Sequence, residues 1–427
     1  MSRVLVDSGV SWLGQIPDSW STCRVKNKFL FHKIIAKEKS VDYDRIALTL
    51  NGVIKRDKDD SSGLQPDNYN GYQVVYKDDL IFKLIDLENV NTSRIGKSEY
   101  EGITSPAYLV LTDKCNTRYS LYYFLNMWYQ EIFNNIGGDG VRSAINKDDL
   151  LKLPFINISI DEQNKIADYL DNQCAKIDEI IKDNNHEIEL LEEYKMKILD
   201  TACLKGVDKH EFINVSHYSI DKIPVGWKFQ KTLGILNMPI TDGPHSTPNL
   251  ISDGIPFISA DAIKDGKIDF SRKRGDISEE DYLEFSKKYI PKLHDIYMIK
   301  SGATTGRVGI VETTDKFTIW SPLAVYRVNK KKMNYKYLYY LLQTNFYQKQ
   351  VQLSWSYGTQ QNIGMRILEK LKVLVPPLPE QEKIVKEIDN KFNKLNKSID
   401  YRKQIIEKLE EYKKSIIYEC VTGKREV

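Results

Sequence analysis

The chain has 427 residues, of which 28% are charged and 41% hydrophobic, and its formal net charge is +3. This balance excludes wholesale disorder, and the length predicts two to three domains with sizeable cores. No apolar run approaches the ~18–20 residues that a membrane span needs, and the N-terminus lacks the pattern of a signal peptide. The five cysteines lie far apart without a CxxC pair. We therefore expect a cytoplasmic protein with reduced thiols and no metal site.

The first segment, residues 1–158, is predicted to be a mixed α/β domain. A β-rich run at 72–76 is bounded by turn residues, and a Tyr-rich amphipathic helix is expected at 119–133. Aromatic side chains at helical spacing are more typical of core packing than of base stacking. Residues 1–160 carry 20 basic and 20 acidic side chains, so charge indicates no partner for this domain.

A long helix is predicted next, over residues 159–206. Ser159 and Glu162 have the spacing of a capping box, and Gly206 follows the last apolar position of the repeat. Residues 161–204 carry 5 basic and 12 acidic side chains. The helix is therefore strongly acidic, which favours pairing with a different helix over pairing with itself.

A second mixed α/β domain is predicted over residues 207–376, and the polar stretch 205–222 is expected to be a linker. Predicted strands lie at 255–259, 308–311 and 323–328, and a Tyr-rich helix at 335–351. Residues 205–378 carry 25 basic and 17 acidic side chains. This net charge of +8 suggests a phosphate-bearing partner, although a solvated surface is the commoner explanation of such a charge.

The last segment, residues 377–427, is predicted to be a second long helix. Pro379 suits a first helical position, and Gly423 follows the last periodic residue. Residues 379–417 align without gaps to 161–199 at an offset of 218, and both contain the run LEEYK. Fainter matches extend upstream to similar opening phrases, IPxxW. The protein is therefore two copies of one unit, a globular domain followed by a long helix.

Apolar residues recur every seven positions in both helices, which is a coiled-coil signal. Each helix would be a rod of roughly 60 Å, and the two can pair antiparallel within one chain as a pseudo-dimer with twofold character. The central heptad of each carries a polar residue, either a buried pair that fixes the register or two residues at the solvent edge. The expected pairing positions are Leu170, Ile177, Asn184, Leu191, Ile198, Ile388, Leu395, Arg402, Leu409 and Ile416.

Motifs of catalysis are missing from the sequence. The stretch 302–307 is not a P-loop, and no dinucleotide or S-adenosylmethionine fingerprint follows a predicted strand. The segment 375–378 lacks the polar and aromatic members of an adenine-methyltransferase motif, and neither HExxH nor GxSxG is present. No catalytic residues are assigned, and we expect a binding subunit that is not an enzyme by itself.

At this point the chain resembles a known family, the specificity (S) subunits of type I restriction–modification systems, over essentially its whole length. The most specific stretches are PPLPEQEKI (376–384), the EEYK…TG ending (410–423), SGVSWLGQIPDSW (8–20) and IPVGW (223–227). The stretches at 74–96, 240–248 and 301–309 are also similar to the family.

The resemblance implies that each globular domain is a target recognition domain that reads one half of a bipartite, interrupted DNA site. It implies that the paired helices set the spacing and dock two modification subunits, which bind S-adenosylmethionine and methylate adenine. Two restriction subunits that use ATP and Mg²⁺ would complete the complex. No cofactor is then expected in this chain. Because the two domains differ in sequence, the half-sites should differ and the target should be asymmetric.

Candidate DNA contacts follow from the loops. Arginine can read guanine and glutamine adenine in a bidentate manner, and Gly-rich loops approach the backbone closely. Each of these residues can equally be a loop-stabilising one. The candidates are Lys83, Arg94 and Lys97 in the first domain and Thr241, His245, Ser246, Thr304, Thr305, Arg307, Gln360 and Gln361 in the second.

Two other interpretations remain open from the sequence. The first is a non-catalytic coiled-coil scaffold with two interaction domains, against which the charge of the second domain argues. The second is a specificity module of a different restriction architecture. An independent nuclease or methyltransferase is the least favoured, since no motif supports it.

Overall fold

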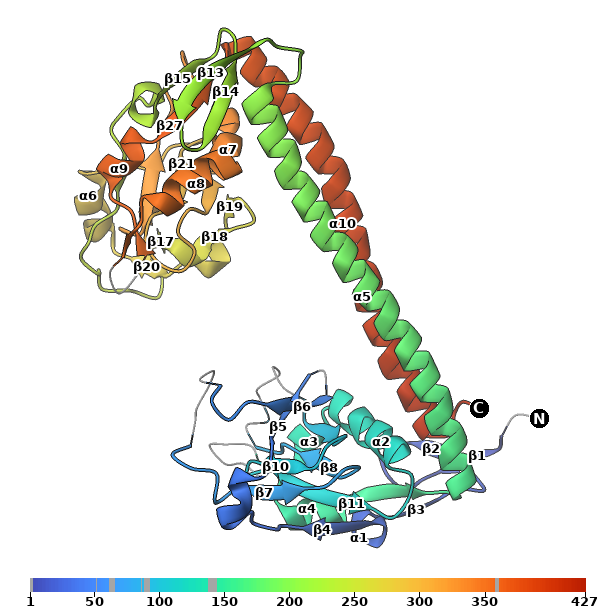
Figure 1. Ribbon diagram of the computed structural model, residues 1–427. Coiled ribbons are helices and arrows are strands. Elements are labelled where there is room, and N and C mark those ends of the chain that lie inside the picture. Colours follow the sequence, from blue (N-terminus) through green and yellow to red (C-terminus); the bar gives the residue numbers. More distant parts are fainter. Residues whose placement is uncertain are drawn as a thin grey trace. The chain divides into compact units, whose positions relative to one another are not determined.

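The computed structural model describes residues 3–50, 52–60, 66–85, 87, 93–136, 144–357 and 361–427 (Figure 1). It divides into two compact units. Unit 1 comprises Met1–Asn185 with Lys403–Val427, and unit 2 comprises His186–Arg402. Each unit therefore contains one globular domain together with part of each long helix.

Unit 1 is built from short strands with helices packed against them. Its two four-stranded sheets have the orders β6-β5-β10-β7 and β4-β11-β8-β9, and β1 pairs with β2 and β3 with β12. The strands are β1 (Leu5–Asp7), β2 (Gln15–Pro17), β3 (Ser21–Arg24), β4 (Phe29–His32), β5 (Arg45–Thr49), β6 (Gly52–Arg56), β7 (Gln73–Val75), β8 (Leu80–Phe82), β9 (Ile95–Lys97), β10 (Gly102–Thr104), β11 (Leu109–Asp113) and β12 (Pro154–Asn157). The helices are α1 (Val25–Lys28), η1 (Lys37–Val41), α2 (Thr117–Tyr129), α3 (Ile132–Ile136) and α4 (Lys147–Lys152).

Unit 2 contains a six-stranded sheet of order β16-β24-β21-β22-β19-β18 and a three-stranded sheet of order β20-β17-β23. The strands are β13 (Phe212–His217), β14 (Ile220–Pro224), β15 (Lys228–Lys231), β16 (Thr241–Asp242), β17 (Ile255–Ile258), β18 (Ile263–Lys264), β19 (Lys267–Ile268), β20 (Gly275–Ile277), β21 (Ile296–Ile299), β22 (Val308–Ile310), β23 (Thr318–Ile319), β24 (Leu323–Tyr326), β25 (Ser356–Tyr357), β26 (Gln361–Asn362) and β27 (Lys372–Val375). The helices are η2 (Thr232–Ile235), η3 (Ala260–Ala262), η4 (Phe270–Arg272), α6 (Glu279–Ser286), α7 (Tyr335–Gln343), α8 (Asn345–Leu353) and α9 (Met365–Lys370).

The two units share an internal framework. The antiparallel pair β8/β11 corresponds to β21/β24, and the parallel contact of β10 with β5 corresponds to that of β23 with β17. A buried aspartate directly precedes the first strand of the antiparallel pair in both units. Asp79 precedes β8, and Asp295 precedes β21. Asp79 accepts a hydrogen bond from Thr112 at 2.7 Å, and Asp295 accepts two from Arg327 at 2.8 and 2.6 Å. The repeat read from the sequence is thus a repeat of structure.

The long helices α5 (Ile160–Lys205) and α10 (Leu378–Val421) run antiparallel (Figure 1). In unit 1, Leu170 near the start of α5 shares one hydrophobic core with Ile416 near the end of α10. In unit 2, Ile198 near the end of α5 shares a core with Ile388 near the start of α10. This arrangement confirms the predicted antiparallel pairing.

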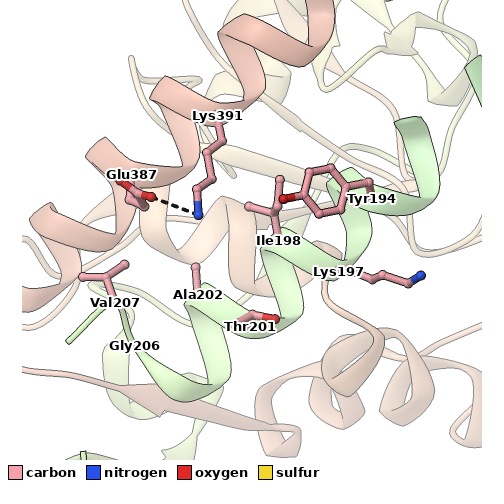
Figure 2. Close-up of a pocket in the computed structure, with 9 residues that line it drawn as sticks. All are labelled: Tyr194, Lys197, Ile198, Thr201, Ala202, Gly206, Val207, Glu387 and Lys391. Atoms are coloured by element: carbon pink, nitrogen blue, oxygen red, sulfur yellow. Dashed lines mark ion pairs between the residues drawn. The ribbon is translucent and has the colours of Figure 1, made fainter. Parts of the chain in front are cut away.

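In unit 2, the last turns of α5 face the first turns of α10 across a shallow groove of about 290 Å³. Figure 2 shows Ile198 and Ala202 on α5 and, on α10, the ion pair between Glu387 and Lys391, whose atoms are 2.9 Å apart. Tyr194 lines the same groove and is 52% exposed. The paired helices therefore leave part of their apolar surface open.

The predicted pairing positions differ in burial. Those nearest the globular domains are buried, whereas several toward the middle of the helices are half-buried because fewer neighbouring elements cover them. The buried positions are Leu170, Ile177, Asn184, Ile198, Ile388 and Ile416, and the half-buried ones are Leu191, Leu395, Arg402 and Leu409.

Each of the two central polar residues has a polar partner within its own unit. Asn184 is 9% exposed, and its amide donates to the Ile180 carbonyl of the preceding turn at 2.8 Å. Arg402 is half-buried and forms an ion pair with Glu187. Asn184 thus has a buried position, and the Arg402 guanidinium is neutralised by a carboxylate of the neighbouring helix.

Identical residues at the start of each long helix hold it to its own domain. Gln163 and Gln381 are almost fully buried. The side-chain carbonyl of Gln163 accepts from the Asn116 backbone N–H at 2.9 Å, and that of Gln381 accepts from the Asn334 N–H at 2.7 Å. Both asparagines are N-caps, of α2 and α7 respectively. The glutamine therefore binds the helix cap of its own domain.

A second repeated contact lies two turns further along each helix. Asp171 accepts from Tyr122 at 2.8 Å and pairs with Arg118 at 2.6 Å. Asp389 accepts from the equivalent Tyr340 and pairs with Lys336 at 2.8 Å. These contacts explain why glutamine and aspartate are identical in the two sequence repeats.

The tyrosines of the two predicted Tyr-rich helices, 119–133 and 335–351, pack in the cores as expected. The structure, however, divides each of these helices into two. The expected helix 119–133 is interrupted at Glu131, whose φ of 56° is left-handed. The expected helix 335–351 is interrupted at Thr344, which ends α7 and caps α8. The prediction of single helices was wrong because apolar periodicity continues through both breaks.

The expected linker 205–222 was also assigned incorrectly. It contains β13 and the start of β14, which pair as an antiparallel hairpin with a bulge. Two neighbouring apolar residues of β13 are exposed, Phe212 by 42% and Ile213 by 48%. The polar composition of the stretch concealed the strands.

All five cysteines are free thiols, as expected from the sequence. Burial raises the pKa of Cys174 to about 11 and that of Cys420 to about 12, so both stay protonated near neutral pH. In the described part of the chain, no helix carries the apolar stretch that crossing a bilayer requires.

Removing the buried glutamine of unit 2 should destabilise the unit. Gln381→Ala leaves the Asn334 N–H and two carbonyls, of Lys332 and Pro376, without their partner. Unsatisfied buried groups cost about 1–3 kcal/mol each. We expect an earlier transition in urea-induced unfolding monitored by circular dichroism. The exposed Glu382→Ala, one residue away, should change stability by no more than about 0.5 kcal/mol. Equal effects of the two variants would contradict the assigned role.

Candidate nucleic-acid interface

Two predicted loops of unit 2 and the segment at 361–363 meet at one edge of the six-stranded sheet. Asp242 ends β16, and Lys300 follows β21, two strands away. The N–H of Ile363 donates to the Lys300 carbonyl at 2.9 Å, and Ser301 forms a β-bridge with Asn362. The structure therefore brings together loop 241–249, loop 300–307 and the segment at 361–363, which are far apart in sequence.

A buried carboxylate organises this edge. Asp242 is fully buried, and its oxygens contact the Lys288 ammonium, the Lys300 ammonium at 3.3 Å and His245 Nε2 at 3.3 Å. Lys288 also donates to the Gly243 carbonyl at 3.0 Å. Because a buried carboxylate must be neutralised, Asp242 holds the Lys288 and Lys300 ammonium groups close together at the start of the loop.

Loop 241–249 turns tightly against the neighbouring strand. A Cβ at Gly243 would lie 1.9 Å from the Ile319 carbonyl oxygen, so only glycine fits there. The next residue, Pro244, accepts from the Ser321 N–H at 3.2 Å. Beyond this turn His245 and Ser246 are exposed, with 72% of the His245 side chain accessible. Both side chains are therefore available to a partner.

Loop 300–307 is fixed by its own hydrogen bonds. The Thr305 hydroxyl donates to the Gly302 carbonyl at 2.7 Å, and the Gly306 N–H donates to Ile299 at 2.8 Å. Gly306 has a φ of 96°, which favours glycine. Thr304 is half-buried and Arg307 is exposed. Among the described residues no carboxylate pairs with the Arg307 guanidinium, so this cation is available.

The glutamine candidates fall at the limit of what is described. Gln360 lies outside the described residues. Gln361 belongs to β26, where its backbone pairs with Tyr357, and its side chain is not described.

The candidates of unit 1 have different surroundings. Arg94 is 1% exposed and donates to the Ile85 carbonyl at 3.2 Å, so its guanidinium is not offered to a partner in this conformation. Lys97 forms ion pairs with Asp78 at 3.0 Å and Glu99 at 2.5 Å. Lys83 is half-buried, and its backbone N–H donates to the Arg94 carbonyl. These three residues lie at β8 and β9 without forming an exposed basic cluster.

Strand pairing identifies the segment of unit 1 that corresponds to loop 241–249. β4 pairs with β11 as β16 pairs with β24, so the residues after His32 are the counterpart. Among them, Lys33 donates to the Pro106 carbonyl at 3.0 Å, and Pro106 occupies the position of Pro322 in the repeat. Sequence comparison missed this segment because it shares no residues with the loop of unit 2.

Comparison with known proteins agrees with this architecture. The family model described as type I restriction modification DNA specificity domain matches residues 21–190 and 224–411. The chain therefore belongs to the family of type I restriction–modification DNA specificity proteins. The two matches coincide with the two halves of the internal repeat.

Two curated relatives come from Methanocaldococcus jannaschii. The putative type I restriction enzyme MjaX specificity subunit is 24% identical over 398 residues, covering 88% of this chain and 87% of the relative. The type I restriction enzyme MjaVIII specificity subunit is 24% identical over 329 residues, covering 74% of each chain. A structure reported for complex assembly and conformational transition of the type I R-M system aligns with a TM-score of 0.69 at 15% identity, covering 96% of this chain and 99% of that one. This last similarity supports the fold.

Neutralising the buried carboxylate should destabilise unit 2. Asp242→Asn leaves Lys300, whose side chain is 11% exposed, without its counter-ion. Breaking a buried ion pair by removing one partner costs about 3–5 kcal/mol. We expect a lower melting temperature in calorimetry. The exposed Asp253→Asn removes the same charge and should shift stability by no more than about 0.5 kcal/mol; matching losses in the two variants would contradict the burial argument.

Proposed function

We propose that this chain supplies the DNA sequence specificity of a type I restriction–modification complex, with each unit reading one half of a bipartite, asymmetric site. The observation that carries the proposal is the duplication itself. Two domains share an internal framework but have unrelated loops at the equivalent sheet edge, 241–249 in one and the residues after His32 in the other. Two domains with the same framework and different loops are suited to recognise two different DNA sequences.

In unit 2 the proposed contacts come from the loops gathered around Asp242. Arg307 is suited to guanine through its two parallel N–H groups, and His245, Ser246 and Thr304 are suited to base edges or phosphates. The net charge of +8 over residues 205–378 supports binding to a polyanion. In unit 1 we propose Lys97 and Lys83, with Lys33 as an addition from the structure.

The paired helices are proposed to set the distance between half-sites and to dock two modification subunits. Tyr194 and Tyr412 occupy the same position of the two repeats and are 52% and 45% exposed. An exposed aromatic residue at the same position of each repeat supports one partner per unit, because apolar side chains exposed on a helix commonly mark interaction surfaces.

The chemistry is assigned to the partners. The modification subunits would bind S-adenosylmethionine and methylate adenine, and two restriction subunits would use ATP and Mg²⁺. This chain is proposed to be non-catalytic, without a cofactor of its own, and to work in the cytoplasm. A scaffold with two protein-interaction domains is the alternative, and the basic second domain argues against it.

Methylation mapping tests the proposal. The chain is co-expressed with the modification subunit encoded beside it in a methylation-free host, and the DNA is sequenced by a method that detects N6-methyladenine. We expect one interrupted, asymmetric motif with one methylated adenine on each strand. An assembled complex that produces no new motif would contradict the proposal and favour the scaffold.

Arg307 should contribute to discrimination between sequences. A bidentate arginine–guanine contact is worth about 1–3 kcal/mol of discrimination, so Arg307→Ala should reduce the ratio of target to non-target binding by about 5- to 150-fold. Fluorescence anisotropy with the two duplexes measures this ratio. Arg366→Ala, which removes an exposed arginine from α9, serves as the control and should keep the ratio. An unchanged ratio for Arg307→Ala would show that it does not read a base.

A further inference from the structure

A cavity of about 570 Å³ in unit 2 brings the candidate Arg307 together with two basic side chains that the sequence analysis did not single out. Lys264 lies in the hairpin β18–β19, Arg272 in η4 and Arg307 at the end of the 300–307 loop, and all three line the cavity. Each is exposed. Three cations from three separate segments thus face one hollow.

These cations form no ion pair within the described part of the protein. No carboxylate within ion-pair distance is found for Lys264, Arg272 or Arg307 among the described residues. Asp265 is the one acidic side chain in the described lining. The nearby Asp269 accepts from the Ser271 N–H and hydroxyl at 3.0 and 2.6 Å, and this bonding, aided by Lys264 and Arg272, lowers its pKa.

Lys267, in the same hairpin as Lys264, differs from it in being paired with a carboxylate. Lys267 is the cross-strand partner of Lys264 and does not line the cavity. Its ammonium is paired with Glu312 at 3.0 Å. The excess of positive charge therefore belongs to the cavity and not to the hairpin as a whole.

Two glycines that line the cavity, Gly266 and Gly306, pack closely against side chains of neighbouring helices. A Cβ at Gly266 would lie 1.9 Å from the Tyr339 hydroxyl, and one at Gly306 would lie 2.5 Å from Gln348 Oε1. Gln348 donates to the Gly306 carbonyl at 3.0 Å and to the Leu342 carbonyl at 2.7 Å. Helices α7 and α8 thereby fix the loop that carries Arg307, so the cation can bind without first ordering its backbone.

We propose that this cavity binds phosphates of the DNA backbone beside the half-site of unit 2, with Lys264 and Arg272 as the phosphate contacts and Arg307 at the border with the base-reading loop. This inference rests on the proposed function. Arginine and lysine are the usual phosphate ligands, and phosphate contacts set the position of a reader without adding sequence information. Lys264 and Arg272 would therefore hold the duplex against the Arg307 loop.

The test uses the full chain in complex with the modification subunit and compares Lys264→Gln/Arg272→Gln with the unaltered protein. Binding to target and non-target duplexes is measured between 50 and 300 mM salt. The slope of log K against log salt is negative and becomes steeper by about 0.9 with each phosphate contact, so the double variant should make it shallower by about 1.8 on both duplexes. The methylated motif should not change.

The control removes the same charge from the same unit. Lys287 and Lys316 are exposed and paired with Glu284 and Glu279, outside the cavity lining. Lys287→Gln/Lys316→Gln should leave the salt slope nearly unchanged. Equal losses in the two double variants would overturn the proposal, because they would show a general effect of net charge.

Two further results would overturn it. The salt slope could stay unchanged in the cavity variant while the methylation motif persists. This result would show that the cavity is not part of the DNA interface, and it would leave the proposed function intact. ATP, used as a free phosphate probe in calorimetry, could bind the unaltered chain and not the variant without any change in the DNA slope. The cavity would then be a nucleotide site. Absence of a methylated motif in the unaltered complex, by contrast, would count against the proposed function itself.

Discussion

The contact on which each unit depends is the buried glutamine at the start of its long helix. The side chains of Gln163 and Gln381 are buried in the globular domain, where each accepts a hydrogen bond from the N-cap residue of a second helix. A buried side-chain amide is costly unless its donors and acceptor are satisfied. The geometry of helix and domain is therefore set together, and the domain keeps a fixed position relative to the first turns of its own long helix. Asp171 and Asp389 stabilise the same attachment of helix to domain, since each accepts a hydrogen bond from a tyrosine and forms an ion pair with a basic side chain.

Much of this architecture could be predicted from the sequence because the information is periodic or repeated. The seven-residue apolar pattern predicted α5 and α10, and the offset of 218 predicted two equivalent units. The breaks at Glu131 and Thr344 could not be predicted, since periodicity continues through them. The hairpin at 212–224 was missed because exposed strands carry polar residues.

The candidate site was predictable to a smaller extent. The glycine and hydroxyl residues near 241–249 and 300–309 indicated loops, and the structure brings both to one sheet edge. Long-range pairing was invisible: neither the ion pair between Asp242 and Lys300 nor the contact of Asn362 with Ser301 has a local signature. The same limit applies to Arg94, which looks like a surface cation in the sequence but is buried because tertiary packing covers it.

The division of the chain has a consequence for synthesis on the ribosome. Unit 2 is one continuous stretch, His186–Arg402, whereas unit 1 needs Lys403–Val427 in addition to its N-terminal part. Ile416 and Cys420 belong to the core of unit 1, and Lys424 donates to the Leu13 carbonyl at 3.2 Å. The domain translated first thus receives its last core residues only after all of unit 2 has been translated, and the domain translated second can be complete before it. A stop codon introduced within residues 403–427 would damage the N-terminal unit and spare the C-terminal one.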